Sequence, residues 1–134
     1  MQLDSRLEQS SEFIANLKLC QLRLSKNAAF PWCILIPQRD NIIEIIDLPL
    51  QEQQLLMEEM TFMSQVMRDI FKPDKINIAA LGNVVPQLHI HIIARYTTDP
   101  AWPNPVWNTV HSDYTEEGLS ARINTIHKGI LSSR

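Results

Sequence analysis

The chain has 134 residues, 45% hydrophobic and 20% charged, which suits one globular domain with a buried core and excludes extensive disorder. The formal net charge of -3 gives no general attraction to nucleic acids or anionic membranes, so neither is an expected partner. No apolar run approaches the roughly 20 residues of a spanning helix, and the polar N-terminus predicts no signal peptide. Two isolated cysteines, Cys20 and Cys33, cannot form a disulfide framework, so we expect a reduced, cytoplasmic setting.

The first third of the chain predicts one short helix followed by strands. Residues 3–9 favour the helix. Three later segments have the length and apolar character of strands: residues 13–17, 20–24 and 32–37. Residues 25–31 predict the loop before the third strand, which Pro37 ends. The apolar run 41–48 does not favour one type of element.

The middle of the chain predicts a long helix and a hairpin. From Leu50 to Phe71 apolar residues recur mostly at three- and four-residue spacing, which is typical of an amphipathic helix, and its methionines are expected to fill the core. Residues 75–81 and 87–96 predict two antiparallel strands separated at Gly82-Asn83.

The tail predicts an ordered loop and a last helix. Residues 99–107 hold three prolines and two tryptophans, which excludes helix and central strand. The helix is expected from Thr115 or Glu116 to about Leu131. The whole pattern predicts a single α+β domain over residues 1–134, with a mainly antiparallel sheet of about five strands, a long helix and a C-terminal helix.

The stretch QLHIHII, residues 87–93, carries the candidate chemistry. In a strand, Gln87, His89 and His91 would share one face, with the two imidazoles' alpha carbons about 7 Å apart, while the aliphatic residues between them pack inward. Such a pair also occurs as ordinary hydrogen-bonding histidines in a sheet. It could instead bind zinc, which requires further ligands. The candidates for those ligands are Asp99, His111, Asp113 and His127, and none stands at a telling spacing.

The same stretch resembles the motif of the histidine triad (HIT) family, His-φ-His-φ-His-φ-φ with φ apolar, with glutamine in the first histidine's place. Upstream, FPWCILIPQR (30–39) is similar to the family's hydrophobic strand followed by Ile-Pro and a basic residue. The resemblance covers residues 20–96, which would form the core, and the WPNPVW tail within 99–134 is similar to bacterial HIT-like nucleotide hydrolases.

This resemblance implies a catalytic role for three residues. His89 would be the nucleophile that attacks the α-phosphorus of a nucleotide, with its other nitrogen bonded to a backbone carbonyl expected in the loop 82–85. His91 would bond the phosphate oxygens or help to protonate the leaving group. Gln87 can orient these groups but cannot titrate, so a proton relay through it is lost.

Five further residues are candidate substrate contacts, and all but Asn27 have a structural alternative. Asn83 is either a phosphate contact or a turn residue, and Arg39 either a site cation or a surface residue. Asn27 would reach the ribose. Arg95 would face phosphate or cap the sheet edge. Trp107 would stack on a base, pack in the core or pack on a partner subunit.

The resemblance also leaves Val84 where many relatives carry a phosphate-binding hydroxyl. It implies an enzyme that cleaves a nucleoside 5′-phosphate linkage, such as a dinucleoside polyphosphate (diadenosine polyphosphate among them) or a nucleoside phosphoramidate, and that forms a homodimer. No cofactor would be required, although Mg²⁺ could accompany a polyphosphate substrate. The alternatives are a nucleotide-binding protein with weak or no turnover and a zinc-binding domain.

Overall fold

The apolar segments form one open, five-stranded sheet in the computed structural model, which describes residues 1–133. Residue 134, the last of the expected tail, lies outside the described residues. The strands are β1 (Ser11–Asn16), β2 (Cys20–Ser25), β3 (Trp32–Pro37), β4 (Lys75–Ala79) and β5 (Ile90–Arg95). Their order is β1-β2-β3-β5-β4, and every neighbouring pair is antiparallel. The predicted α+β fold is therefore confirmed.

Three α-helices accompany the sheet, and local sequence signals mark their ends. They are α1 (Ser5–Ser10), α2 (Leu50–Phe71) and α3 (Glu116–Ser132). The Asp4 carboxylate accepts from the Arg6 backbone N–H at the start of α1, and the Thr115 hydroxyl accepts from the Gly118 N–H at the start of α3. Lys72, in the left-handed conformation with φ 49°, ends α2.

The larger core lies between one face of the sheet and the helices α2 and α3. Leucine, isoleucine and cysteine side chains of β2, β3 and β5 pack there against Leu56, Met63 and Ile126. Ile90 and Ile92 belong to this core, as the alternation in QLHIHII predicts. Glu59 of α2 reaches the turn before β2, where its two carboxylate oxygens accept from the backbone N–H groups of Leu19 and Cys20, each at 2.9 Å.

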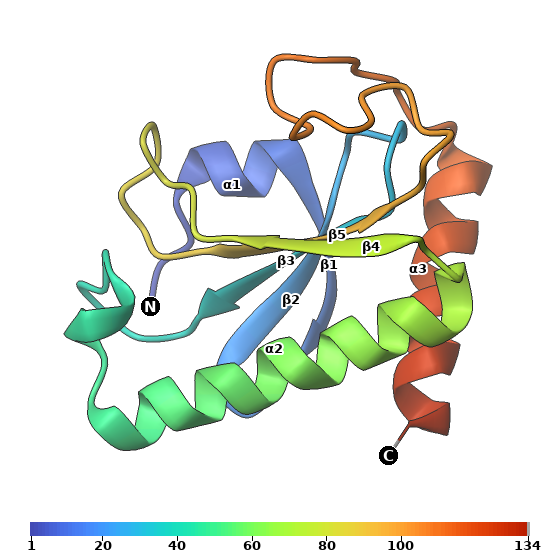
Figure 1. Cartoon of the computed structure of the whole chain (residues 1–134). Coiled ribbons are helices and arrows are strands. Elements are labelled where there is room, and N and C mark those ends of the chain that lie inside the picture. Colours follow the sequence, from blue (N-terminus) through green and yellow to red (C-terminus); the bar gives the residue numbers. More distant parts are fainter. Residues whose placement is uncertain (134) are drawn as a thin grey trace.

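The second face of the sheet is covered by α1 and by the Pro/Trp loop, residues 99–107. Figure 1 shows α1 and this loop on the side of the sheet opposite α2. Leu7 of α1 and Val106 of the loop pack on Trp32, Ile34 and other apolar residues of this face. His91 also lies on this face, so the histidine face of the sheet is largely apolar rather than polar.

Two sequence-based boundaries are wrong at the connection between β4 and β5. β4 ends at Ala79 and β5 begins at Ile90, so Gln87 and His89 precede the strand rather than belonging to it. The ladder from β4 ends where Ala79 pairs with His91, and the Leu88 N–H instead donates to the Ile42 carbonyl at 2.9 Å. The ten-residue connection 80–89 therefore forms a wide loop instead of a tight turn.

The apolar run 41–48 forms no strand and contains one short 3-10 helix, η1 (Ile45–Asp47). Within residues 1–133, no helix combines the length and the apolarity that crossing a membrane requires.

Candidate active site

An open cavity of about 880 Å³ lies over the second face of the sheet, with His89 and His91 in its lining. Its walls come from α1, the end of β2 with the loop that follows, the connection 80–89 and the loop before α3. Trp32 and Ile34 of β3 also line it. The cavity therefore combines apolar walls with two buried imidazoles, 6% and 5% exposed, a combination typical of small-molecule sites.

The His89 ring is oriented by its own backbone. Its Nδ1 lies 2.7 Å from the carbonyl oxygen of Gln87. A carbonyl oxygen only accepts, so Nδ1 carries a proton, and in the neutral ring Nε2 is unprotonated. The orienting carbonyl expected in loop 82–85 thus belongs to Gln87 instead. The chain bends at Gln87, before β5, and this carbonyl lies against Nδ1 of the ring.

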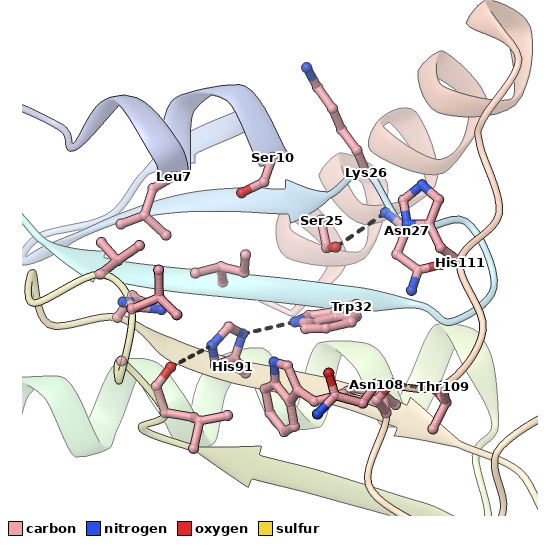
Figure 2. Close-up of a pocket in the computed structure, with 18 of the residues that line it drawn as sticks. Leu7, Ser10, Ser25, Lys26, Asn27, Trp32, His91, Asn108, Thr109 and His111 are labelled. Atoms are coloured by element: carbon pink, nitrogen blue, oxygen red, sulfur yellow. Dashed lines mark hydrogen bonds between the residues drawn. The ribbon is translucent and has the colours of Figure 1, made fainter.

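The His91 ring stands beside His89 and contacts protein groups at both nitrogens. The two ring centres are 4.9 Å apart at an interplanar angle of 77°. The indole Nε1–H of Trp32 donates to Nδ1 of His91 at 2.9 Å, and Nε2 lies 3.4 Å from the Leu81 carbonyl (Figure 2). Burial first, and then the neighbouring His89, lower the pKa of His91 from 6.5 to about 4, so the ring is neutral at pH 7.

Gln87, predicted beside the histidines, points away from them into a separate hollow. Its side-chain oxygen accepts from the Asp4 backbone N–H at 2.8 Å, and its amide nitrogen donates to the Gln2 carbonyl at 3.1 Å. Arg6 in turn donates to the Val84 carbonyl at 3.0 Å. Gln87 thus anchors the segment leading into α1, which forms one wall of the cavity.

Three of the predicted substrate contacts do line the cavity: Asn27, Asn83 and Trp107. The Asn27 amide nitrogen donates to the Val110 carbonyl at 2.9 Å, and its oxygen accepts from the Ser112 N–H at 3.1 Å. Asn27 therefore holds the loop before α3 in place. Trp107 packs edge-on against His91, with ring centres 5.0 Å apart.

The two predicted arginines lie outside this cavity, and each pairs with a carboxylate. Arg39 bonds Glu52 at 2.8 Å. Arg95, 1% exposed, bonds both oxygens of Asp99 at 2.7 and 3.0 Å, and Trp102 packs over its guanidinium. This places Arg95 at the base of the Pro/Trp loop, where it fixes the loop's start.

Sequence reasoning missed Lys26 and Trp32, both of which line the cavity. Lys26 directly precedes Asn27 in a loop already predicted to reach the ligand, so the sequence did hold a signal for it. The sequence held no such signal for Trp32, because its contact with His91 depends on the register between β3 and β5. In that register Ile34 pairs with His91, and Trp32 lies diagonally across from His91.

The zinc-binding alternative finds no third ligand in the described part of the chain. Across residues 1–133, no group of three or more His, Cys, Asp or Glu side chains could hold a metal ion. His111 instead bonds Asp113 at 2.9 Å, and Nε2 of His127 donates to the Ile14 carbonyl at 2.6 Å.

Comparison with known protein families decides the affiliation, because residues 6–98 match the HIT domain family. The chain belongs to the HIT domain family. The match extends the resemblance seen in the sequence to include α1. HIT proteins bind nucleotides and are generally nucleotide hydrolases or transferases.

Solved structures of bacterial HIT proteins share both the fold and much of the sequence. A histidine triad protein from Bradyrhizobium japonicum is 42% identical, with a TM-score of 0.94 over 96% of this chain and 97% of that one. A histidine triad protein from Marinobacter aquaeolei is 40% identical, with a TM-score of 0.94 over 99% of this chain and 98% of that one. One from Sinorhizobium meliloti is 40% identical, with a TM-score of 0.93 over 96% of each chain. The comparison with curated proteins gave no match.

Proposed function

We propose that this HIT protein cleaves a nucleoside 5′-phosphate linkage through a covalent nucleotidyl-histidine at His89. The substrate would be a nucleoside phosphoramidate or a dinucleoside polyphosphate, diadenosine polyphosphates included. The observation that carries this proposal is the 2.7 Å contact between Nδ1 of His89 and the Gln87 carbonyl, beside an open cavity.

That contact supports nucleophilic attack in two ways. It leaves the lone pair of Nε2 available in the neutral ring. It also stabilises the ring after attack, because an imidazole bonded to phosphorus through Nε2 is positively charged and its Nδ1–H then donates more strongly to the carbonyl.

The reaction would proceed in two displacements at the same phosphorus. First, Nε2 forms a bond to the α-phosphorus while the bond to the leaving amine or phosphate breaks; the leaving group keeps the electron pair, and an amine takes a proton from solvent water as it departs. Water, or another acceptor, then attacks the phosphorus, which releases the nucleotide and restores the imidazole of His89. His91 would act on the phosphate oxygens, since its ring adjoins His89 at 4.9 Å.

The cavity walls suggest how the rest of the nucleotide is held. Trp107 offers an aromatic surface for the base, and Asn83 offers an amide near the histidines. Lys26 and His111 are the basic side chains at this cavity besides the histidine pair. With a polyphosphate substrate, Mg²⁺ would enter with the substrate, and no resident cofactor is proposed. We also propose a cytoplasmic homodimer.

Turnover of a fluorogenic adenosine phosphoramidate by the wild type and by His89→Ala tests the proposal. We expect hydrolysis by the wild type and none by the variant. Equal turnover by both proteins would remove His89 from the nucleophile's role. Calorimetry with AMP on both proteins serves as the control, because a folded variant should retain binding through the cavity walls.

A second candidate function is nucleotide binding with little turnover. It is favoured by the side chain of Gln87, which bonds the backbone of Gln2 and Asp4 rather than the histidines, and by Val84, which offers no hydroxyl. AMP binding without hydrolysis of either substrate class would select this alternative.

A further inference from the structure

The contact between Trp32 and His91 assigns the proton on a catalytic imidazole. The indole N–H is a donor and cannot accept. At 2.9 Å from Trp32 Nε1, Nδ1 of His91 must therefore be the unprotonated acceptor. The neutral ring consequently carries its proton on Nε2, and the 3.4 Å distance to the Leu81 carbonyl agrees with a weak donor at that atom.

The position of the indole is fixed by the sheet and by neighbouring rings. Trp32 is the first residue of β3 and pairs with Ile93, so it lies diagonally across from His91 on the same face. Its ring packs edge-on against His91 and Trp107, with centres 5.6 and 5.5 Å apart. Trp32 is 8% exposed and His91 5%, so water hardly competes for the bond between them.

Resting on the function proposed above, we propose that Trp32 is a positioning residue that keeps His91 a neutral hydrogen-bond donor through Nε2. A second proton on His91 would have to enter at Nδ1, where it would face the indole N–H donor. The bond would then break, and two donors would oppose each other in a buried site. The imidazolium form is thereby disfavoured.

This assignment decides between the two roles open to His91. A neutral imidazole donates a hydrogen bond from Nε2 without releasing the proton, so His91 would stabilise the phosphoryl oxygens rather than protonate the leaving group. The titratable neighbour of His91 is His89, and the other groups around it are Trp32 and Ile34 of β3, Trp107 of the loop before α3 and the Leu81 carbonyl.

Nitrogen NMR of uniformly labelled protein tests the assignment directly. At pH 7 we expect Nδ1 of His91 to show the shift of an unprotonated nitrogen and Nε2 that of a protonated one. In Trp32→Phe, which keeps an aromatic ring but lacks the donor, the pKa of His91 should rise by about one unit, the size of one lost hydrogen bond.

Trp107→Phe is the matched control. It trims an indole that also packs on His91, yet it leaves the Trp32 bond in place, so the His91 titration should stay close to that of the wild type. Equal shifts in both variants would mean that packing alone controls His91 and would overturn the proposal. So would a protonated Nδ1 in the wild type, a measurement that requires no variant to fold.

The NMR readout needs no turnover, which separates this inference from the proposed function. If the protein were inactive on every nucleotide tested, the proposed function would be removed. The predicted nitrogen shifts would still establish that the hydrogen bond from Trp32 sets the tautomer of His91.

Discussion

Acidification should destabilise this protein through His91. The pKa of His91 falls to about 4 in the folded state, from the usual 6.5 of an exposed histidine. Between these values the unfolded chain binds a proton that the folded chain does not, so stability is full above pH 6.5 and is lost as the pH falls toward 4. From pH 7 to pH 5 the free energy of unfolding should fall by about 2 kcal/mol from this residue alone. His91 is only 5% exposed, so solvent screening does not reduce this figure much.

Comparison with His91→Asn isolates this contribution. Asparagine places an amide oxygen near the position of Nδ1, where it can accept from Trp32, but it does not titrate. Urea unfolding followed by tryptophan fluorescence at pH 7, 6 and 5 gives the free energy for each protein. The wild type should lose about 2 kcal/mol more than the variant between pH 7 and pH 5. Equal losses in the two proteins would refute the reasoning.

Three further substitutions test other parts of the structure. Glu59→Ala should lower the free energy of unfolding by about 2–4 kcal/mol, because two buried backbone N–H groups lose their acceptor. Glu58→Ala, at the exposed neighbouring residue, should change it by less than about 0.5 kcal/mol in the same urea titration. Arg95→Ala should lower the free energy of unfolding by about 3–5 kcal/mol, because the buried Asp99 carboxylate loses its cationic partner. The variant should keep its AMP affinity in calorimetry. Weaker AMP binding without lost stability would instead place Arg95 at the phosphate. Gln87→His should give no faster phosphoramidate hydrolysis than the wild type, because that side chain faces the N-terminal segment; a large gain in rate would show that a relay position is missing.

The sequence predicted the elements of this fold well because their signals are local. The three- and four-residue spacing from Leu50 to Phe71 predicts the bounds of α2, and the helix expected from Thr115 or Glu116 is α3, which begins at Glu116. The aliphatic alternation through Ile90 and Ile92 also correctly predicted which side chains enter the larger core.

The parts that the sequence could not predict depend on contacts between distant segments. The bond from Trp32 to His91 joins residues 59 apart and follows from strand register, which no local pattern specifies. The Gln87 side chain is turned away by Asp4, 83 residues earlier. The family pattern predicted Gln87 beside the histidines, but the wide connection before β5 gives it another partner.

The covalent step itself can be observed by rapid quenching. The wild type would be mixed with adenosine phosphoramidate, quenched in alkali, in which phosphohistidine bonds survive, and digested for mass spectrometry. A peptide containing His89 should carry the added mass of one adenylate, and the same peptide from His89→Asn should not. Turnover by the wild type with no adduct at His89, or with an adduct on a different residue, would contradict nucleophilic attack by this imidazole.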